Sequence, residues 1–247
     1  MSYVVLARKL RPQRFSDLIG QEVIAQILQN AIRSNRVAHA FLFSGSRGVG
    51  KTSAARILTK ALNCLEPDNV DPCNTCENCR EISSNASADV YEIDAASNRG
   101  IENIRELREN VKYAPARCRY KVYIIDEAHM LTLESFNALL KTLEEPPSHV
   151  KFILATTDPH KVPVTILSRC QRYDFQRIPL QRMLEFLGQV AVQENLQLSP
   201  KSLELIARHA AGGMRDALTA LDQVLSFAGE QASEAEVLQI LGIADAS

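Results

Sequence analysis

Eight consecutive residues, Gly45 to Thr52, have the composition of a loop that binds phosphate. They fit the pattern G-x-x-x-x-G-K-[ST], and they lie between a predicted strand and a predicted helix, which is the setting that the pattern requires. Glycines let backbone N–H groups converge on phosphate oxygens, and the positive end of the following helix faces the same charge. A glycine turn that merely connects strand to helix is the weaker alternative.

This phosphate loop predicts a nucleotide site. The residues expected to contact the nucleotide are Gly45, Ser46, Arg47, Gly48, Val49, Gly50, Lys51, Thr52 and Ser53. Lys51 should reach the β and γ phosphates as a catalytic residue, and the hydroxyl of Thr52 should ligate Mg²⁺.

An acidic pair, Asp126 and Glu127, follows residues 121–125, the most strand-like run in the chain. In an open α/β sheet, ligands bind beyond the carboxyl ends of the strands, where a carboxylate at this position lies. We expect Asp126 to hold Mg²⁺ together with Thr52, and Glu127 to polarise the attacking water as a general base. The alternative is that the pair caps the next helix, which an intact phosphate loop disfavours.

Four of the six cysteines crowd one turn-rich segment, with the spacing Cys64-x8-Cys73-x2-Cys76-x2-Cys79. In a reducing compartment this crowding favours a metal site over disulfides. Four thiolates satisfy tetrahedral Zn²⁺ and leave no open position, so the segment predicts a structural zinc site. An iron–sulfur cluster is the rival, because closely spaced cysteines also hold such clusters.

These chemical groups must be positioned by strands and helices. Short apolar runs predict strands at 40–44, 90–94, 121–125, 151–155 and 172–175. Apolar positions at helical spacing predict helices near 23–31, 52–63, 101–111 and 136–144, and then near 183–190, 203–210, 217–225 and 237–241. Strands that alternate with helices predict a parallel sheet that is covered on both faces.

The expected fold is an α/β domain, residues 1–178, with a five-stranded parallel sheet flanked by helices. A small all-α domain, residues 179–247, is expected to follow it, because no strand pattern appears there. The cysteine segment, at about 64–80, has no apolar period and is interpreted as an insertion in the first domain.

Composition excludes several classes of protein. The 247 residues are 46% hydrophobic, enough for a buried core, and Lys+Arg 28 against Asp+Glu 29 leave a formal net charge of −1. That balance is not typical of a protein that coats DNA, so any contact with nucleic acid must be local. Neither a signal peptide nor an apolar stretch of roughly 18 residues, the length of a membrane span, is present. We expect a cytoplasmic protein with no membrane partner.

Together, these motifs make the chain similar to the AAA+ ATPases, and within them to the clamp-loader subunits of bacterial DNA polymerase III. The resemblance covers essentially the whole chain. It rests on Arg11-Pro12 with Phe15, Gly20-Gln21, the phosphate loop, the four cysteines, Ala114-Pro115-Ala116-Arg117, and the runs FNALLKTLEEPP and ATTDPHKVPVTILSRC. It implies an AAA+ fold, an ATPase that uses ATP and Mg²⁺ within a DNA polymerase holoenzyme, and a zinc module at the cysteine segment.

The resemblance also assigns residues that periodicity does not reveal. Thr157 corresponds to a polar sensor of the γ phosphate and the catalytic water, and Arg215 to a second sensor that the helical lid carries onto the phosphates. Arg169 corresponds to an arginine finger that stabilises transition-state charge in the neighbouring subunit. The N-terminal residues expected to surround the adenine base are Val4, Ala7, Arg11 and Pro12, with plain packing as the alternative.

The family implies partners as well. Such subunits join other clamp-loader subunits in a hetero-pentamer that opens the sliding clamp and places it around primed DNA. Arg99, Arg105 and Lys141 could face DNA phosphates, although solvation explains these charges equally well. The family's collar domain is missing after Ser247, so we expect a mostly monomeric fragment that hydrolyses ATP slowly.

Two other functions remain open at this point. A non-hydrolysing scaffold subunit is disfavoured because the phosphate loop and the acidic pair are complete. A DEAH-type helicase is suggested by Asp126-Glu127-Ala128-His129. No arginine-rich helicase pattern follows downstream, and Ser168-Arg169-Cys170 is typical of clamp loaders instead.

Overall fold

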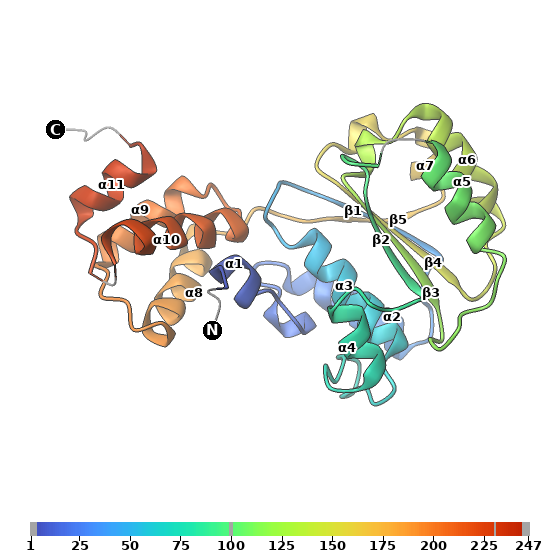
Figure 1. Ribbon diagram of the computed structural model, residues 1–247, viewed down its shortest axis with the longest axis horizontal. Coiled ribbons are helices and arrows are strands. Elements are labelled where there is room, and N and C mark those ends of the chain that lie inside the picture. Colours follow the sequence, from blue (N-terminus) through green and yellow to red (C-terminus); the bar gives the residue numbers. More distant parts are fainter. Residues whose placement is uncertain (1–3, 99–100, 230, 244–247) are drawn as a thin grey trace.

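The computed structural model describes residues 4–98, 101–229 and 231–243 (Figure 1). The strands are β1 (Ala40–Ser44), β2 (Val90–Asp94), β3 (Lys121–Asp126), β4 (Val150–Thr156) and β5 (Gln171–Asp174). The helices are α1 (Leu6–Lys9), α2 (Glu22–Arg33), α3 (Lys51–Asn63), α4 (Glu77–Ser83), α5 (Ile101–Asn110), α6 (Leu133–Glu144), α7 (Val164–Leu167), α8 (Leu180–Gln193), α9 (Pro200–His209), α10 (Met214–Ala228) and α11 (Glu234–Leu241). Three 3₁₀ turns lie at Phe15–Asp17, Ala128–Met130 and Pro159–Lys161.

The five strands form one parallel sheet in the order β2-β3-β4-β1-β5. Every residue of β1 and β4 is buried, as expected for central strands that are covered on both faces. β2 and β5 lie at the two edges and are more exposed, with Tyr173 the buried residue of β5. The predicted five-stranded parallel sheet with flanking helices is confirmed.

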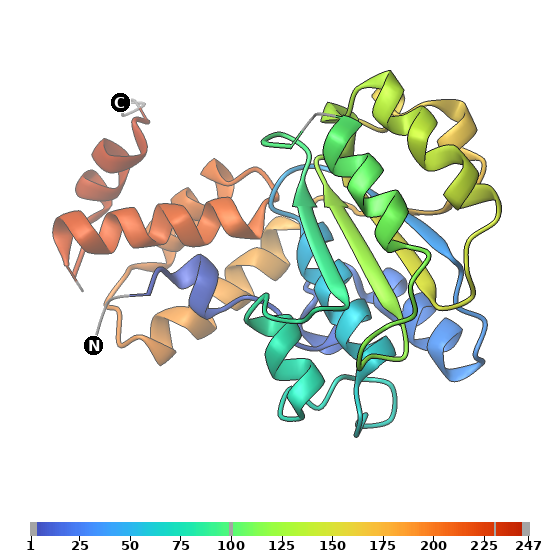
Figure 2. The same ribbon diagram turned by 45° about the vertical axis from the view of Figure 1, so that its right-hand side comes forward.

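Two hydrophobic clusters cover the two faces of this sheet. Successive residues of a strand point to opposite faces, and Phe41 and Phe43 of β1 accordingly join one cluster while Leu42 joins the other. Helices α2 and α3 lie on the first face, and α5 and α6 lie on the second (Figures 1 and 2). The sheet is thereby fixed as a rigid layer whose strand ends can carry a site.

Helices α8 to α11 form a separate helical unit with its own core, which we call the lid. Residues that lie within it include Met183, Leu187 and Leu221. The N-terminal helix α1 packs on α10 of the lid, beside it in both views, and the Leu6 N–H donates to Asp222 Oδ2 at 2.7 Å. Helix α1 therefore lies on the lid, although the residues that follow it lead into the sheet domain.

Helices α6 and α4 differ from what the sequence patterns predict. Helix α6 begins at Leu133, three residues before the predicted start, because Thr132 caps it by accepting a hydrogen bond from Ser135 N at 3.2 Å. Helix α4 begins inside the cysteine segment and extends to Ser83, and only three of its seven residues are buried. Among the helices of the described residues, none combines the length and the apolar character of a membrane span.

Candidate nucleotide site and cysteine cluster

The phosphate loop joins β1 to α3 and depends on glycine at defined points. Gly45 has φ +147°, and a Cβ placed there would lie 2.5 Å from the carbonyl oxygen of Phe175. Gly48 and Gly50 also have positive φ, in the region that only glycine adopts without strain. The loop therefore needs its glycines for backbone conformation and for a close approach of neighbouring backbone.

Side chains from distant parts of the chain support this loop. Gln21 is buried, and its Nε2 donates to the carbonyl of Gln176 at 2.7 Å and lies 3.5 Å from that of Val49. Arg177 Nε donates to Ser46 Oγ at 3.4 Å. The loop is thus held from both of its sides before any ligand is considered.

Lys51 lies inside the loop. Its side chain is almost buried, and Nζ donates to the carbonyls of Gly45 at 2.8 Å and of Ser46 at 2.7 Å. Burial lowers its pKa, while the carboxylates of Glu127 and Asp126 act in the opposite direction. The ammonium is therefore placed at the centre of the loop with two acidic groups nearby.

Thr52 and Asp126 come together although they lie 74 positions apart. The Thr52 hydroxyl donates to Asp126 Oδ2 at 2.6 Å, and Asp126 Oδ1 accepts from the N–H of Glu127 at 2.9 Å. The two residues meet because β1 and β3 are parallel strands of one sheet and end at the same edge. A hydroxyl and a carboxylate oxygen are ligands that Mg²⁺ prefers.

Glu127 has an unusual backbone and two polar neighbours. Its φ is +48°, in the left-handed region that residues other than glycine rarely adopt. Glu127 Oε2 accepts from Thr157 Oγ1 at 3.1 Å and lies 3.5 Å from His129 Nδ1, which is also 3.1 Å from Thr156 Oγ1. His129 is a site residue that the sequence did not predict, because its only signal there is its place after Asp126-Glu127-Ala128.

The N-terminal residues reach the site from the lid side. Arg11 Nε donates to Ser53 Oγ at 3.4 Å. Burial lowers the pKa of Arg11 most, and Asp126 and Arg215 are both near enough to act on its charge. Pro12 is half-buried and Val4 is exposed. Arg11 thus connects the N-terminal residues to the first turn of α3.

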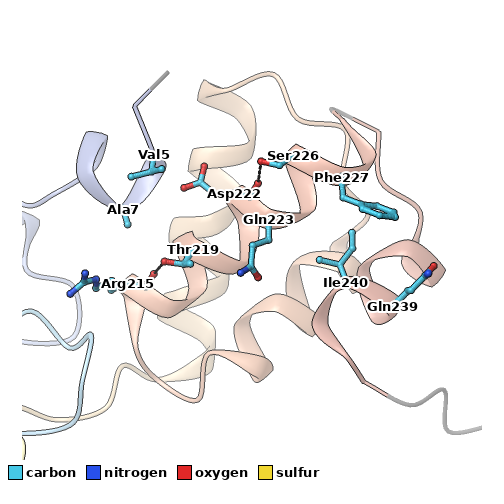
Figure 3. A pocket seen from close by; sticks show the side chains of 10 residues that line it. All are labelled: Val5, Ala7, Arg215, Thr219, Asp222, Gln223, Ser226, Phe227, Gln239 and Ile240. Atoms are coloured by element: carbon cyan, nitrogen blue, oxygen red, sulfur yellow. Dashed lines mark hydrogen bonds between the residues drawn. The ribbon is translucent and has the colours of Figure 1, made fainter. Parts of the chain in front are cut away.

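A groove of about 810 Å³ runs along α10 (Figure 3). Its lining consists of Val5, Ala7, Arg215, Thr219, Asp222, Gln223, Ser226, Phe227, Gln239 and Ile240. Ala7 and Arg215 lie at one end of the groove in Figure 3, and Phe227 lies at the other. The Arg215 end adjoins the phosphate loop, because Arg215 N donates to the carbonyl of Gly48 at 3.4 Å.

The remaining predicted residues lie elsewhere. Arg169 forms an ion pair with Glu144 and donates to the carbonyl of Thr165 at 2.6 Å, and neither partner belongs to the phosphate loop. Arg105 and Lys141 are exposed on the neighbouring helices α5 and α6. Arg99 lies outside the described residues.

The four cysteines of the cysteine segment converge. Cys64 ends α3 as its C-cap and Cys79 lies on α4, and the Sγ atoms of Cys64, Cys73, Cys76 and Cys79 are all within 4.8 Å of one another. The Cys64 and Cys76 Sγ atoms are 4.0 Å apart. Tetrahedral zinc with bonds of about 2.3 Å requires sulfurs about 3.8 Å apart, which this arrangement nearly matches.

The thiols of the chain differ in their surroundings. Hydrogen bonds, the one from Thr75 foremost, lower the pKa of Cys73 to about 6. Burial raises the pKa of Cys79, of Cys118 to about 11, and of Cys170 to about 12. Cys118 and Cys170 lie outside the cluster, and their surroundings favour the neutral thiol.

Comparison with known proteins places the chain in a family. The family model described as DNA polymerase III, delta subunit matches residues 20–179, and the one described as DNA polymerase III clamp loader subunit, ATPase lid domain matches residues 183–230. The chain is 46% identical to DNA polymerase III subunit gamma of Buchnera aphidicola, over 98% of the chain and 67% of that protein. The chain belongs to the gamma/tau family of DNA polymerase III subunits. The resemblance stated from the sequence is thereby confirmed.

Longer members of the gamma/tau family match as closely. DNA polymerase III subunit tau of Bacillus subtilis is 54% identical over 98% of the chain, which spans only 43% of that relative. A solved structure of Thermotoga maritima RuvB, titled a Holliday junction branch migration motor, aligns with a TM-score of 0.65 over 94% of this chain and 72% of that one. At 18% identity this likeness shows the fold alone, and it agrees with the AAA+ fold expected from the resemblance.

Proposed function

We propose that this gamma/tau-family chain is the ATP-hydrolysing motor of the DNA polymerase III clamp loader, which loads the sliding clamp onto primed DNA. The contact of 2.6 Å between the Thr52 hydroxyl and the Asp126 carboxylate carries the proposal, since it joins the phosphate loop to the acidic pair in a chain of this family. The cytoplasm, where replication takes place, is the compartment that this function requires.

The residues present fit a nucleotide with Mg²⁺. Thr52 and Asp126 would hold the ion, which supplies positive charge that stabilises the phosphates during transfer. Backbone N–H groups of the phosphate loop and the start of α3 bind the phosphates of ATP. Lys51, whose Nζ donates to two loop carbonyls, would exchange these hydrogen bonds for one to a phosphate oxygen.

Glu127 is the proposed general base. Thr157 donates to its carboxylate at 3.1 Å, so one hydrogen bond fixes the group that must accept a proton from water. In this role Thr157 orients Glu127 and is also placed to contact the γ phosphate. A carboxylate held at a fixed point raises the rate more than a mobile one does.

Two arginines complete the proposal. Arg215 lies where α10 meets the phosphate loop, so its contact with the phosphates would depend on the position of the lid. Arg169 is paired within its own chain to Glu144, away from the phosphate loop, which suits a role at the nucleotide of a neighbouring subunit. The adenine base of the nucleotide would lie near Val4, Ala7, Arg11 and Pro12. This place is at the end of the groove that adjoins the phosphate loop.

The cysteine segment is proposed to hold a structural Zn²⁺ ion through Cys64, Cys73, Cys76 and Cys79. Four convergent thiols leave no open position for chemistry, and they connect the end of α3 to α4. The iron–sulfur alternative is distinguished by metal analysis and by visible absorption.

The other two functions are weaker. A scaffold that does not hydrolyse ATP has no need of Glu127 held by Thr157. A helicase of the DEAH type is disfavoured by the family to which the chain belongs. Separation of DNA strands by this protein alone would instead favour the helicase function.

One set of measurements tests the proposal. The ATPase rate of the full-length subunit is measured alone, with the other clamp-loader subunits, and with clamp and primed DNA. We expect stimulation at each step, and loss of it in Arg169→Ala. Binding of nucleotide that is never followed by hydrolysis in the complete assembly would favour the scaffold.

Charge reversal at Arg105 and Lys141 should weaken stimulation by DNA, and an unchanged response would remove these two residues from the DNA surface.

A further inference from the structure

Residues 11–17, which we call the strap, connect the nucleotide site to the cysteine segment. At the nucleotide end, Arg11 Nε donates to Ser53 Oγ at 3.4 Å, on the first turn of α3. At the other end, Phe15 N donates to Asp71 Oδ1 at 2.9 Å. The strap is therefore attached both beside the phosphate loop and on the segment that contains the four cysteines.

Lys60 joins the strap, the cysteine segment and α3 at one point. It lies in the last turn of α3 and is only 2% exposed. Its Nζ donates to Gln13 Oε1 of the strap at 2.7 Å and to Asn74 Oδ1 of the cysteine segment at 2.6 Å. Burying an ammonium costs free energy unless its hydrogen bonds are satisfied, so these two partners are held firmly in place.

The hydrogen bonds continue from Lys60 to the nucleotide site. Gln13 Nε2 donates to the carbonyl of Arg11 at 3.0 Å, so the side chain held by Lys60 fixes the backbone of Arg11. Asn74 Nδ2 reaches the carbonyl of Gln13 at 3.4 Å and adds a second link from the cysteine segment. Asn74, Lys60, Gln13 and Arg11 thus form one chain of contacts that ends at Ser53.

We propose that Lys60 and Asn74 are positioning residues for the nucleotide site, which hold the strap so that the Arg11 guanidinium faces the bound nucleotide. The inference rests on the proposed function, because it takes the phosphate loop to bind a nucleotide. It gives the cysteine segment a role in nucleotide affinity, although the segment lies at the opposite end of α3.

The test measures the dissociation constant of the fluorescent analogue mant-ADP, with Mg²⁺ present. Lys60→Met removes the ammonium, and Asn74→Gly removes the side chain while it keeps a residue that tolerates φ +61°. Both variants should raise the dissociation constant about three- to tenfold, the range that one or two hydrogen bonds allow. Asn74→Asp keeps the acceptor for Lys60 and should remain within about twofold of the unchanged protein.

A matched control and a double variant separate positioning from general damage. Arg117 forms ion pairs with Glu77 and Glu81 of α4 and not with the strap, so Arg117→Met should leave mant-ADP affinity unchanged. Arg11→Met should weaken binding as Lys60→Met does. The double variant Lys60→Met with Arg11→Met should be no weaker than Arg11→Met alone, because both substitutions act through one group.

The outcomes are distinguishable. Unchanged mant-ADP affinity in Asn74→Gly, or additive losses in the double variant, overturns the inference while the proposed function stands. If the unchanged chain fails to bind mant-ADP, the proposed function fails and takes the inference with it. Should Lys60→Met not fold, the half-buried Asn74 and its two variants decide the question alone. In the assembled loader, the same variants should raise KM and leave kcat unchanged.

Discussion

The two ends of α3 carry the phosphate loop and the cysteine segment, and different forces shape them. At the amino end, Gly45 must have no side chain, because the Phe175 carbonyl lies where a Cβ would be. At the carboxyl end, the cysteine segment contains one short helix, and thiols and side-chain hydrogen bonds connect it to its neighbours. Close backbone packing therefore constrains the first end, and contacts between side chains constrain the second.

This difference separates the consequences of substitution. A polar side chain in the phosphate site can be replaced with loss of chemistry and little loss of fold, because the sheet still holds the loop. Loss of a thiol from the proposed zinc site should instead lower stability, because metal binding and folding are coupled. The following four tests examine this contrast.

The largest effect is expected for Glu127→Gln. Loss of a general base should lower the ATPase rate of the assembled loader about 10²- to 10⁴-fold, while mant-ATP affinity and the melting temperature stay the same. Glu134→Gln, which replaces an exposed carboxylate at the start of α6, is the matched control. Unaltered turnover in Glu127→Gln would falsify the assignment of the base.

The next largest effect is expected for Cys79→Ser, which removes a buried thiol of the cluster. Bound zinc should fall from one equivalent to none, and the free energy of unfolding should fall by about 3 kcal/mol or more, since metal binding and folding are coupled. The control variant Cys118→Ser changes a thiol outside the cluster, so the protein should keep one equivalent of zinc. The two are compared by metal analysis and denaturant unfolding, and full zinc retention by Cys79→Ser would contradict the ligand set.

A smaller effect is expected for Gly45→Ala, which tests the claim that packing shapes the phosphate loop. The added Cβ would meet the Phe175 carbonyl at 2.5 Å at a φ of +147°, so unfolding free energy should fall by about 2 kcal/mol. Gly188→Ala is the opposite case, since it lies within α8 with open space around it, and should stabilise by about 0.5–1 kcal/mol. Equal effects in urea unfolding would show that the loop tolerates a side chain.

The smallest effect is expected for Asp89→Asn, immediately before β2. Burial alone would raise the pKa of Asp89, but hydrogen bonds from the N–H groups of Cys118, Ala116 and Arg117 outweigh it and lower the pKa. The ionised carboxylate therefore stabilises the fold above the unfolded-state pKa, about 3.9, and this contribution is lost as pH falls through the folded-state value.

The difference in unfolding free energy between the unchanged chain and Asp89→Asn should be about 1 kcal/mol at neutral pH, because one acceptor oxygen remains. It should shrink as the pH is lowered from about 5 towards 3. A constant difference across that range, measured by urea unfolding at each pH, would mean that the charge of Asp89 contributes nothing.

The fold could be predicted from the sequence wherever burial is continuous. β1 and β2 have the predicted bounds, Ala40–Ser44 and Val90–Asp94, and the parallel sheet is confirmed. The start of α6 was predicted three residues too late, because the prediction followed the apolar positions from Phe136 and did not use the capping residue Thr132. Helix α4 was not predicted, because its seven residues are too few to show a helical period.

The candidate site divides in the same way. The phosphate loop could be identified because its glycines, lysine and threonine act within eight consecutive residues. The contact of Glu127 with Thr157 spans 30 positions, and that of Lys60 with Gln13 spans 47. Contacts of this kind depend on how the elements pack, and a single sequence carries no periodic signal for them.

Helix α10 touches the phosphate loop at its first turn, where Arg215 N meets the carbonyl of Gly48. It then runs 15 residues, or about 22 Å, to Phe227 and Ala228 at the far end of the groove. A helix that rotates about one end displaces its other end in proportion to its length. A tilt of α10 by about 10° about its first turn would displace Phe227 by about 4 Å. A small movement of the lid beside the phosphates would therefore be a larger movement at the far end of the groove.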